Sequence, residues 1–264
     1  MLFRLLAGLV FSASISALSK KLHLLTTDGA IAATLIGATV FGWGGWDWAA
    51  SVVFFFVSSS VLTKVGRRRK AEFAQASIQN GARDYRQVLA NGLLPASCVI
   101  AYALTSHSNW YLIFLGTLAC ATADTWGTEI GLLSNKKPVS IITGRMVEPG
   151  ISGGVTLLGV FASLAGGISL AAIGILVSQF DFAIFRTAII ISIVGLAGSI
   201  VDSILGATIQ AQYQCQICGR RTEQSLHCQR QSAKLSGLGW LDNNRVNLLS
   251  GLVSALLTFF LISV

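Results

Sequence analysis

Three acidic residues lie within long apolar stretches of the sequence, where a carboxylate is uncommon. Asp124 and Glu129 fall in the stretch 110–133, and Asp202 falls in the stretch 186–209. A carboxylate at the centre of a membrane-spanning helix costs on the order of 2.5–3.5 kcal/mol on insertion scales, so such residues usually face a cavity and mark a functional site. These acids are therefore the candidate catalytic residues. The structural alternative is that they only join helices through hydrogen bonds.

The two acids of the first stretch are five positions apart, which places them about 140° apart around a regular helix. Asp124 and Glu129 therefore converge on one site only if the helix is distorted at Gly127 or if the two acids contact different partners. Proteins usually bind Mg²⁺ through one or two carboxylates together with the phosphates of a substrate. Asp124, Glu129 and Asp202 are accordingly the candidate Mg²⁺ ligands.

A glycine-rich segment, Thr143–Val155, predicts a phosphate-binding site. Its glycines run directly into the predicted span 152–177, and the free backbone N–H groups and the dipole at the start of a helix attract phosphate. Basic side chains close by would add positive charge. The alternative is a flexible connection with a glycine turn. The candidate phosphate-binding residues of this region are Gly150, Ser152, Gly153 and Gly154, together with Lys136, Lys137 and Arg145.

Three more polar residues adjoin other apolar stretches. Asn91 lies within the stretch 88–104, where it either points into the same cavity or makes a polar contact between helices. Asp242 and Asn243 directly precede the last apolar stretch, so their polar groups lie on the same side of the membrane as the other candidates. All three join the candidate phosphate-binding residues.

Four potential metal ligands lie in the last long loop. Cys215 and Cys218 form a C-x₂-C motif, and the adjacent pair His227 and Cys228 follows. Together they offer the nitrogen and sulfur ligands of a zinc site, although adjacent His and Cys are an awkward pair of ligands. The alternative is a cluster of reduced, unliganded thiols. A structural zinc ion is expected rather than a catalytic one, since the chemistry considered below needs no activated water.

The composition indicates that membrane-spanning helices position these residues. Of the 264 residues, 53% are hydrophobic and only 11% are charged, against roughly 25% charged in an ordinary soluble protein. Such a chain will not stay solvated, which excludes a disordered protein and argues against an ordinary soluble enzyme. The five cysteines, without a small secreted framework around them, give no case for disulfides.

Eight apolar stretches are long enough to span a bilayer, which requires about 20 residues. The sequence predicts an all-α polytopic transmembrane bundle that forms one domain over 1–264, with a loop at about 210–246 that carries the cysteine cluster. The first stretch resembles a signal peptide, and its cleavage would leave seven spans, but Lys20 and Lys21 directly after it favour a retained helix. The predicted spans cover about 2–18, 29–45, 46–63, 88–104, 110–133, 152–177, 186–209 and 247–264.

The basic residues predict how the bundle is oriented. All of the 19 Lys and Arg residues except Arg4 and Arg186 lie in the four loops 19–28, 64–87, 134–151 and 210–246. Basic loops face the cytoplasm by the positive-inside rule, so the candidate site is expected at the cytoplasmic face of a multi-pass membrane protein. The basic surplus is therefore an orientation signal with contact to anionic lipids, and not a nucleic-acid footprint.

The loop 64–87 holds more basic residues than any of the other three loops. Its run 64–70 is interpreted as a topology and lipid anchor rather than a substrate site, because clusters of Lys and Arg beside a spanning helix bind anionic lipid surfaces. For Arg83 and Arg86, near the end of the loop, the structural alternative is that they are solvated anchors.

Several blocks of the sequence stand together in the order of one membrane family. They are ATADTWGTE (121–129), TGRMVEPGISGGV (143–155), DSILGA (202–207), CQIC (215–218), HC (227–228) and WLDNNRVN (240–247). Through them the chain resembles, from about Asp28 to its end, the integral membrane family long catalogued as domain of unknown function 92, which contains the phytyl-phosphate kinases of plants and cyanobacteria. That family carries an acidic residue at the position of Asn244, so a metal-ligand role there would fall to Asp242 or be absent.

The resemblance implies a membrane kinase. It would transfer the γ-phosphoryl group of a nucleoside triphosphate, with CTP as the implied donor, to phytyl phosphate or a related prenyl monophosphate. The product would be the diphosphate, a prenyl donor for the synthesis of tocopherol and related quinones. Such a transfer needs mainly positioning and charge neutralisation. The expected partners are the nucleotide, the prenyl monophosphate and membrane lipids, with no nucleic acid and no oligomeric state predicted.

Two other functions remain open. A transporter of polyprenyl phosphate or small ions would use the acids as proton or cation sites, but the spans with Asp124 and Asp202 run in the same direction and their polar residues gather at one side, which favours an enzyme. A cytidylyltransferase that joins CTP to the lipid phosphate would use the same groups. The chain holds neither a G-x₄-G-K-[ST] loop nor the protein-kinase signatures, so its nucleotide site must be of another kind.

Overall fold

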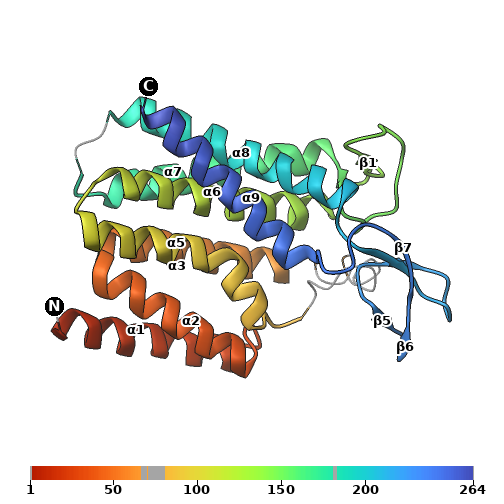
Figure 1. Ribbon diagram of the computed structural model, residues 1–264, viewed down its shortest axis with the longest axis horizontal. Coiled ribbons are helices and arrows are strands. Elements are labelled where there is room, and N and C mark those ends of the chain that lie inside the picture. Colours follow the sequence, from red (N-terminus) through yellow and green to blue (C-terminus); the bar gives the residue numbers. More distant parts are fainter. Residues whose placement is uncertain (1, 67–69, 71–80, 181–182, 264) are drawn as a thin grey trace.

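The protein folds as a bundle of long α-helices, which confirms the predicted all-α polytopic architecture (Figure 1). The computed structural model describes residues 2–66, 70, 81–180 and 183–263. In this part of the chain the helices are α1 (Leu2–Lys21), α2 (Thr27–Thr39), its π-helical continuation η1 (Val40–Gly44), α3 (Trp46–Lys64), α5 (Tyr85–Thr105), α6 (Asn109–Gly131), α7 (Leu157–Val177), α8 (Ile184–Thr208) and α9 (Asn243–Ser263).

Each predicted span corresponds to a helix, and six of the described helices are long and apolar enough to cross a membrane by themselves: α1, α3, α5, α7, α8 and α9. Two differ from these six for separate reasons. The helix α2 has only 13 residues before η1 continues it. The helix α6 has 23 residues, but its carboxyl-terminal half contains Asp124, Glu129 and several threonines, which lower its mean hydropathy.

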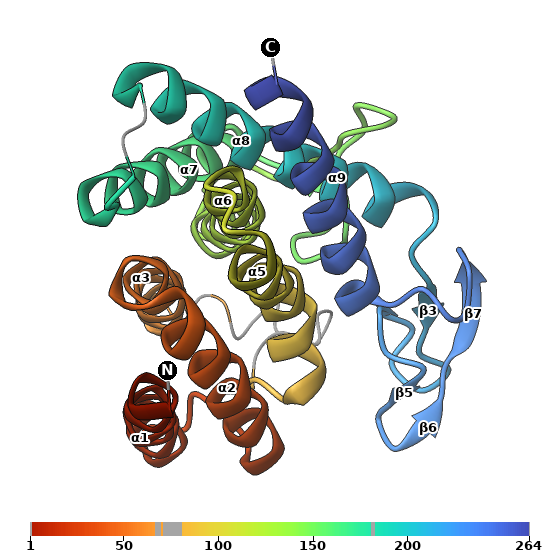
Figure 2. The same cartoon turned by 60° about the vertical axis from the view of Figure 1, so that its left-hand side comes forward.

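The polar half of α6 is tolerated because α6 is the central helix of the bundle. It contacts α3, α5, α7, α8 and α9, and Figure 2 shows it in their midst. Every residue from Tyr111 to Ala123 is buried. A helix that is covered on all sides faces protein rather than lipid, so its polar groups can be satisfied by neighbouring helices.

Small residues let these helices approach closely. A Cβ atom at Gly116 would overlap the side chain of Thr258 on α9, and one at Gly127 would overlap Ser163 on α7. Such contacts between small residues are the usual basis of helix packing within a membrane. A larger side chain at either glycine would push a neighbouring helix away from α6.

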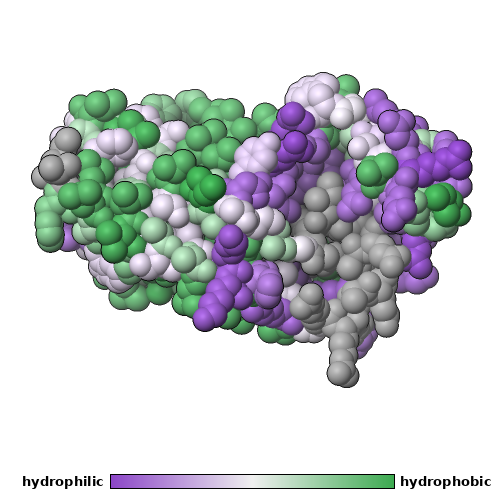
Figure 3. Space-filling view, turned by 90° about the horizontal axis from the view of Figure 1, so that it is seen from below, coloured by the Kyte–Doolittle hydropathy of each residue, from purple (hydrophilic) through white to green (hydrophobic). Residues whose placement is uncertain are grey.

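The two chain termini lie at one end of the bundle, and the long connections lie at the other (Figure 1). We call the second the loop end. It gathers the connections α1–α2, α3–α5, α6–α7 and α8–α9, which are the four basic loops of the sequence. Figure 3 shows hydrophilic residues concentrated at this end and hydrophobic residues over the helical body. The predicted alternation of basic and bare loops is thus confirmed, whereas the compartment that the loop end faces remains a prediction.

Short antiparallel strands give the two longest described connections their shape. Strand β1 (Val139–Ser140) pairs with β2 (Gly154–Val155) between α6 and α7. Between α8 and α9, β3 (Gln212–Gln214) lies between β4 (Arg221–Thr222) and β7 (Ala233–Ser236), and β5 (Leu226–His227) pairs with β6 (Arg230–Gln231).

One predicted boundary is wrong. The glycine-rich segment does not run directly into a helix, because Gly154 belongs to β2 and α7 begins only at Leu157. Thr156 forms the N-cap, and its hydroxyl accepts a hydrogen bond from the backbone N–H of Gly159 at 3.0 Å. The segment is therefore a turn held by a two-stranded ladder rather than the first turn of a helix.

Candidate active site

A cavity of about 390 Å³ lies at the loop end, where α6, α7 and α8 meet the glycine-rich segment. Asp124 on α6 and Asp202 on α8 both line it. A much smaller void of about 10 Å³ lies between α5, α6, α8 and α9, and the same two acids line that void as well. We call the first the acidic cavity and the second the inner cavity. The fold therefore brings these two predicted acids together.

Asp202 is held in place by α9. It is 8% exposed, and the hydroxyl of Ser250 donates a hydrogen bond to its Oδ2 at 3.0 Å. The side-chain amide of Asn247, oriented with its nitrogen toward α8, donates to the same oxygen at 3.0 Å. Sequence reasoning missed both donors. Asn247 could have been found, because it ends the WLDNNRVN block and stands one helical turn after Asn243.

Asp124 contributes a carboxylate for which the described part of the chain provides neither a hydrogen-bond donor nor an ion-pair partner. It lies close enough to Asp202 for the two carboxylates to interact electrostatically. Two carboxylates that share a site repel each other, and a divalent cation bound by both would offset that repulsion. The oxygen ligands at the acidic cavity thus fit Mg²⁺.

A third acid at this cavity, Glu223, comes from the loop between β4 and β5 and was not predicted. The hydroxyl of Ser152 donates a hydrogen bond to its carboxylate. Burial raises the pKa of Glu223 to about 7, and its charge also acts on Asp202. No sequence signal identifies Glu223, because its position depends on how the loop folds back onto the glycine-rich segment.

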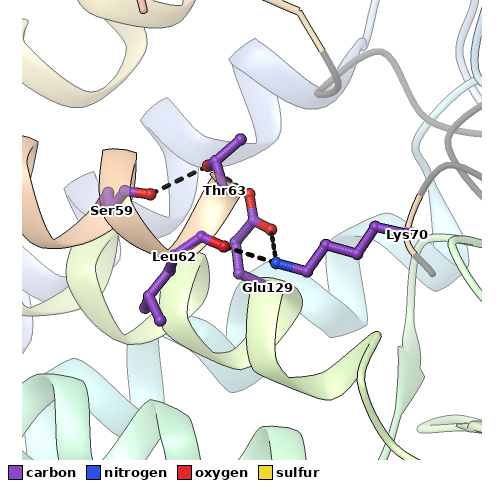
Figure 4. Close-up of polar contacts among 5 residues, drawn as sticks. All are labelled: Ser59, Leu62, Thr63, Lys70 and Glu129. Atoms are coloured by element: carbon purple, nitrogen blue, oxygen red, sulfur yellow. Dashed lines mark hydrogen bonds and ion pairs between the residues drawn. The ribbon is translucent and has the colours of Figure 1, made fainter. Parts of the chain in front are cut away.

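Glu129 also lines the acidic cavity, but both of its oxygens already have partners (Figure 4). Lys70 Nζ lies 2.6 Å from Oε2, and the hydroxyl of Thr63 donates to Oε1 at 2.6 Å. The same ammonium group donates to the carbonyl of Leu62 at 2.7 Å. Since α6 continues unbroken through Gly127, the helix is not distorted there. Glu129 lines the same cavity as Asp124, but its own carboxylate binds Lys70 and Thr63.

The position of Lys70 corrects part of the anchor interpretation. Its side chain is 3% exposed and its charge is paired with Glu129, so it is not available to lipid head groups. Residues 67–69 of the same basic run lie outside the described residues. Removing one partner of such a buried ion pair strongly destabilises the folded protein, because the other charge stays buried without a partner.

The glycine-rich segment borders the acidic cavity as the sequence suggested. Gly150, Ser152, Gly153 and Gly154 line it, and so does Lys136. Gly153 has a φ of +77°, and a Cβ there would overlap Ala207 on α8, so only glycine fits. The segment can offer hydrogen-bond donors to an anion, since Ser152 already binds the carboxylate of Glu223.

The remaining candidates are divided by the fold. Asn91 lines the inner cavity beside the two acids, and Asn243 lines the acidic cavity. Lys137 and Arg145 are exposed and line neither cavity. Asp242 also lies outside both linings, because its carboxylate accepts a hydrogen bond from the backbone N–H of Arg245 at 3.0 Å at the start of α9.

The cysteine cluster is assembled from two parts of the β-strand region. One ligand atom from each of Cys215, Cys218, His227 and Cys228 lies within 4.8 Å of the others. The Nδ1 atom of His227 is 3.6 Å from the sulfur of Cys218 and 3.3 Å from that of Cys228. Zn–S bonds of about 2.3 Å and Zn–N bonds of about 2.0 Å in a tetrahedron require N-to-S separations near 3.5 Å, so the four residues fit zinc.

The helical bundle and its acid-lined cavity define a polytopic membrane protein with a polar site at one end of its spans. The chain belongs to the family described as Integral membrane protein DUF92, whose sequence pattern matches residues 10–255. The resemblance noted in the sequence is thereby confirmed. The matched range includes every residue of the two cavities described above.

Proteins from plants and from other organisms are similar over most of the chain. Protein PGR of Arabidopsis thaliana is 34% identical over 99% of this chain and 96% of its own length. An uncharacterized membrane protein of Methanocaldococcus jannaschii is 29% identical over 79% of this chain and 84% of its own. Protein VTE6, chloroplastic, of A. thaliana is 24% identical over 86% of this chain and 62% of its own. No solved structure shows significant similarity.

Proposed function

We propose that this protein is a membrane kinase that transfers the γ-phosphoryl group of a nucleoside triphosphate, CTP in our proposal, to phytyl phosphate or a related prenyl monophosphate. The diphosphate product would serve tocopherol and prenylquinone synthesis. The observation that carries the proposal is that Asp124 and Asp202 line one cavity together with the glycine-rich segment and Lys136. Resemblance to a family that contains phytyl-phosphate kinases supports it, as does the similarity to the chloroplastic protein VTE6.

The chemistry asks little of the protein beyond positioning. An oxygen of the acceptor phosphate attacks the γ-phosphorus, a new P–O bond forms, and the bond to the β-phosphate oxygen breaks as the nucleoside diphosphate leaves with the electron pair. The acceptor is already ionised, so no general base is required. The barrier is then lowered by holding the two phosphates in line and by neutralising their charge.

The residues of the acidic cavity can divide these tasks. Asp124 and Asp202 would hold Mg²⁺, which neutralises phosphate charge in such reactions. The turn around Gly153, with Lys136 beside it, would bind the phosphates of the donor, with Ser152 donating its hydroxyl. Because Ser152 donates to Glu223 in the structure, we propose that an incoming phosphate exchanges with that carboxylate.

Glu129 fits a positioning role better than a direct one. Its oxygens are taken by Lys70 and Thr63, so it would act by holding Lys70 and the end of α3 against α6, next to the acidic cavity. The ion pair also connects the carboxyl end of α3 to α6. We therefore propose that Glu129 contributes to the site through Lys70 rather than as a Mg²⁺ ligand.

We further propose that the whole chain forms one membrane domain whose loop end faces the cytoplasm, and that Cys215, Cys218, His227 and Cys228 bind a structural zinc ion. The charge distribution supports the orientation, and the ligand separations given above support the zinc site. A zinc ion would hold the β-strand region in its fold, and this region places Glu223 at the acidic cavity. It would take no part in phosphoryl transfer.

The test is to incubate the purified full-length protein with CTP labelled in the γ-phosphate, with phytyl phosphate and with Mg²⁺. We expect the label to appear in phytyl diphosphate. Asp124→Asn and Asp202→Asn should each abolish transfer. Asp47→Asn is the matched control, because Asp47 is also 8% exposed but lies at the opposite end of the bundle, at the start of α3. Full activity in Asp202→Asn would contradict the proposal.

Product analysis in this experiment and a separate uptake assay in sealed vesicles distinguish the alternatives. A cytidylyltransferase would release pyrophosphate and retain the cytidine moiety in the lipid, whereas a kinase releases CDP. A transporter would move substrate into sealed vesicles without consuming nucleotide. The position of the acid pair near the loop end, rather than at the middle of the bundle where transporter sites usually lie, favours the enzyme.

A further inference from the structure

A second sizeable cavity, of about 120 Å³, lies on the other side of α5, enclosed by α1, α2 with η1, α3 and α5. Its walls are almost entirely apolar, with side chains such as Phe11, Ile15, Ile36, Val52 and Phe56. We call it the apolar cavity. On α1 its lining runs from Phe11 to Ser19, which is about 12 Å at 1.5 Å per residue. The cavity is thus an elongated space that follows the helices.

One charged side chain, Arg83, lies at the loop end of this lining. Its guanidinium group stands over the rings of Phe55 and Phe56, 5.9 and 5.8 Å from their centroids. Within the described residues no carboxylate forms an ion pair with it. Glu129 attracts it at longer range, but the oxygens of Glu129 already bind Lys70 and Thr63. Arg83 is therefore half-buried against aromatic rings rather than fully solvated.

The backbone fixes Arg83 in this position. Its N–H donates to the carbonyl of Leu24 at 2.9 Å, and its carbonyl accepts from the N–H of Thr26 at 3.1 Å. The carbonyl also packs so closely on Gly29 that a Cβ there would overlap it. An arginine whose main chain is held in place and whose guanidinium group lies over two aromatic rings is preorganised to bind an anion.

The apolar cavity adjoins the candidate active site. Asn91 and Pro95 on α5 line both the apolar cavity and the inner cavity. Asp124 and Asp202 line both the inner cavity and the acidic cavity. The acid pair therefore stands between an apolar space with one cation on the α5 side and the glycine-rich segment on the other side.

We propose that the apolar cavity binds the hydrocarbon chain of the acceptor, a single-chain isoprenoid monophosphate, and that Arg83 and Asn91 bind its phosphate. This inference rests on the proposed function and adds where the acceptor lies. The donor nucleotide then approaches from the glycine-rich segment, and the two phosphates meet at the acid pair. A single elongated cavity with one cation matches one chain with one phosphate, whereas a membrane phospholipid carries two chains.

Binding of the acceptor can be measured without catalysis. The full-length protein in detergent, without nucleotide, is titrated with phytyl phosphate, and with phytol as the analogue that lacks the phosphate. Arg83→Gln should weaken phytyl phosphate binding at least tenfold and leave phytol binding unchanged. Arg86→Gln is the matched control, because it removes the same charge three positions later from an exposed side chain and should change neither.

A second pair of variants tests the chain site and does not depend on Arg83. Val53→Phe fills the apolar cavity from α3 and should weaken phytyl phosphate and phytol alike. Val57→Phe, one turn further along the same helix, is the matched control, since Val57 is 49% exposed and outside the lining. Arg83→Lys, which keeps the charge, should retain more binding than Arg83→Gln even if the loss of ring contacts lowers stability.

The outcomes distinguish the two proposals. Unchanged phytyl phosphate binding in both Arg83→Gln and Val53→Phe, or a tightly held phospholipid in the cavity that phytyl phosphate does not displace, would overturn this inference while leaving the kinase proposal in place. If binding follows the expected pattern but the protein never transfers phosphate, this inference is supported and the kinase proposal is contradicted.

Discussion

The hydroxyl of Ser152 donates a hydrogen bond to the carboxylate of Glu223, although 71 positions separate the two residues in the sequence. The contact joins the glycine-rich segment to the β-strand region that holds the cysteine cluster. It also places Glu223 at the acidic cavity, which Asp124, Asp202 and Glu129 line as well. The two loops are therefore in contact and line the same cavity.

Glu223 should make stability depend on pH in a defined direction. Burial raises its pKa from the usual 4.5 to about 7, so the folded state binds the proton more tightly than the unfolded state. The resulting stabilisation is complete below about pH 4.5 and is lost as the pH rises through 7. Glu223→Gln mimics the neutral form, so we expect its Tm to equal that of the wild type below about pH 4.5 and to exceed it by several degrees near about pH 8.

The measurement is thermal unfolding of the two proteins in detergent across this pH range. Glu148→Gln is the control, because Glu148 is an exposed acid at the same end of the bundle, and its Tm should follow the wild type at every pH. A Glu223→Gln curve parallel to the wild-type curve would show that Glu223 does not titrate in this window.

Removing one partner of the Lys70–Glu129 ion pair should be costly. Lys70→Met leaves the 8% exposed Glu129 without its cation, and we expect a loss of about 3–5 kcal/mol of unfolding free energy. Glu129→Gln added to Lys70→Met removes the unpaired charge, keeps an acceptor for Thr63 and should recover most of the loss. Denaturant or thermal unfolding measures both. Lys64→Met, an exposed lysine at the end of α3, should change little; an equal effect there would refute the role of the pair.

The cysteine cluster should hold one zinc ion per chain. Elemental analysis of the purified protein is expected to find zinc, and Cys218→Ala should lose it and unfold at a lower temperature, because the metal contributes folding free energy. Cys98→Ala, which alters a buried cysteine of α5 outside the cluster, should retain the zinc. Protein that is stable and free of zinc after purification without chelators would count against the site.

Gly153 should tolerate no side chain. Gly153→Ala strains a φ of +77° and also overlaps Ala207. The backbone strain alone costs about 1–3 kcal/mol of stability, and the overlap adds to it, so we expect a larger loss of stability together with loss of nucleotide binding. Gly144→Ala separates the two effects, since Gly144 has a φ of +65° but no neighbour within 4 Å of the added Cβ. It should show only the backbone cost, as measured by unfolding and by nucleotide titration. Equal effects of the two substitutions would mean that contact with α8 is unimportant.

The sequence by itself determined the membrane architecture. The length of each apolar stretch is a local property that the thickness of the bilayer selects, and the basic loops gave the alternation that places both termini at one end. It also gave the family, the acids Asp124 and Asp202 and the cysteine cluster. These conclusions depend on residue types, on spacing and, for the family, on the resemblance of whole sequence blocks, so they required no knowledge of which helices touch.

Only the tertiary structure decided which polar groups meet. Glu129 lines the cavity with the other two acids, but it lies about 140° around α6 from Asp124, and its oxygens contact Lys70 and Thr63. Lys70, predicted as a lipid anchor, pairs with Glu129. Glu223 lies in a loop whose sequence has no periodic pattern, so its place at the site could not be predicted. Such contacts depend on helix packing and loop folding between distant positions, which local apolar patterns do not encode. The same holds for Arg83, whose place in the apolar cavity is set by hydrogen bonds to the α1–α2 connection.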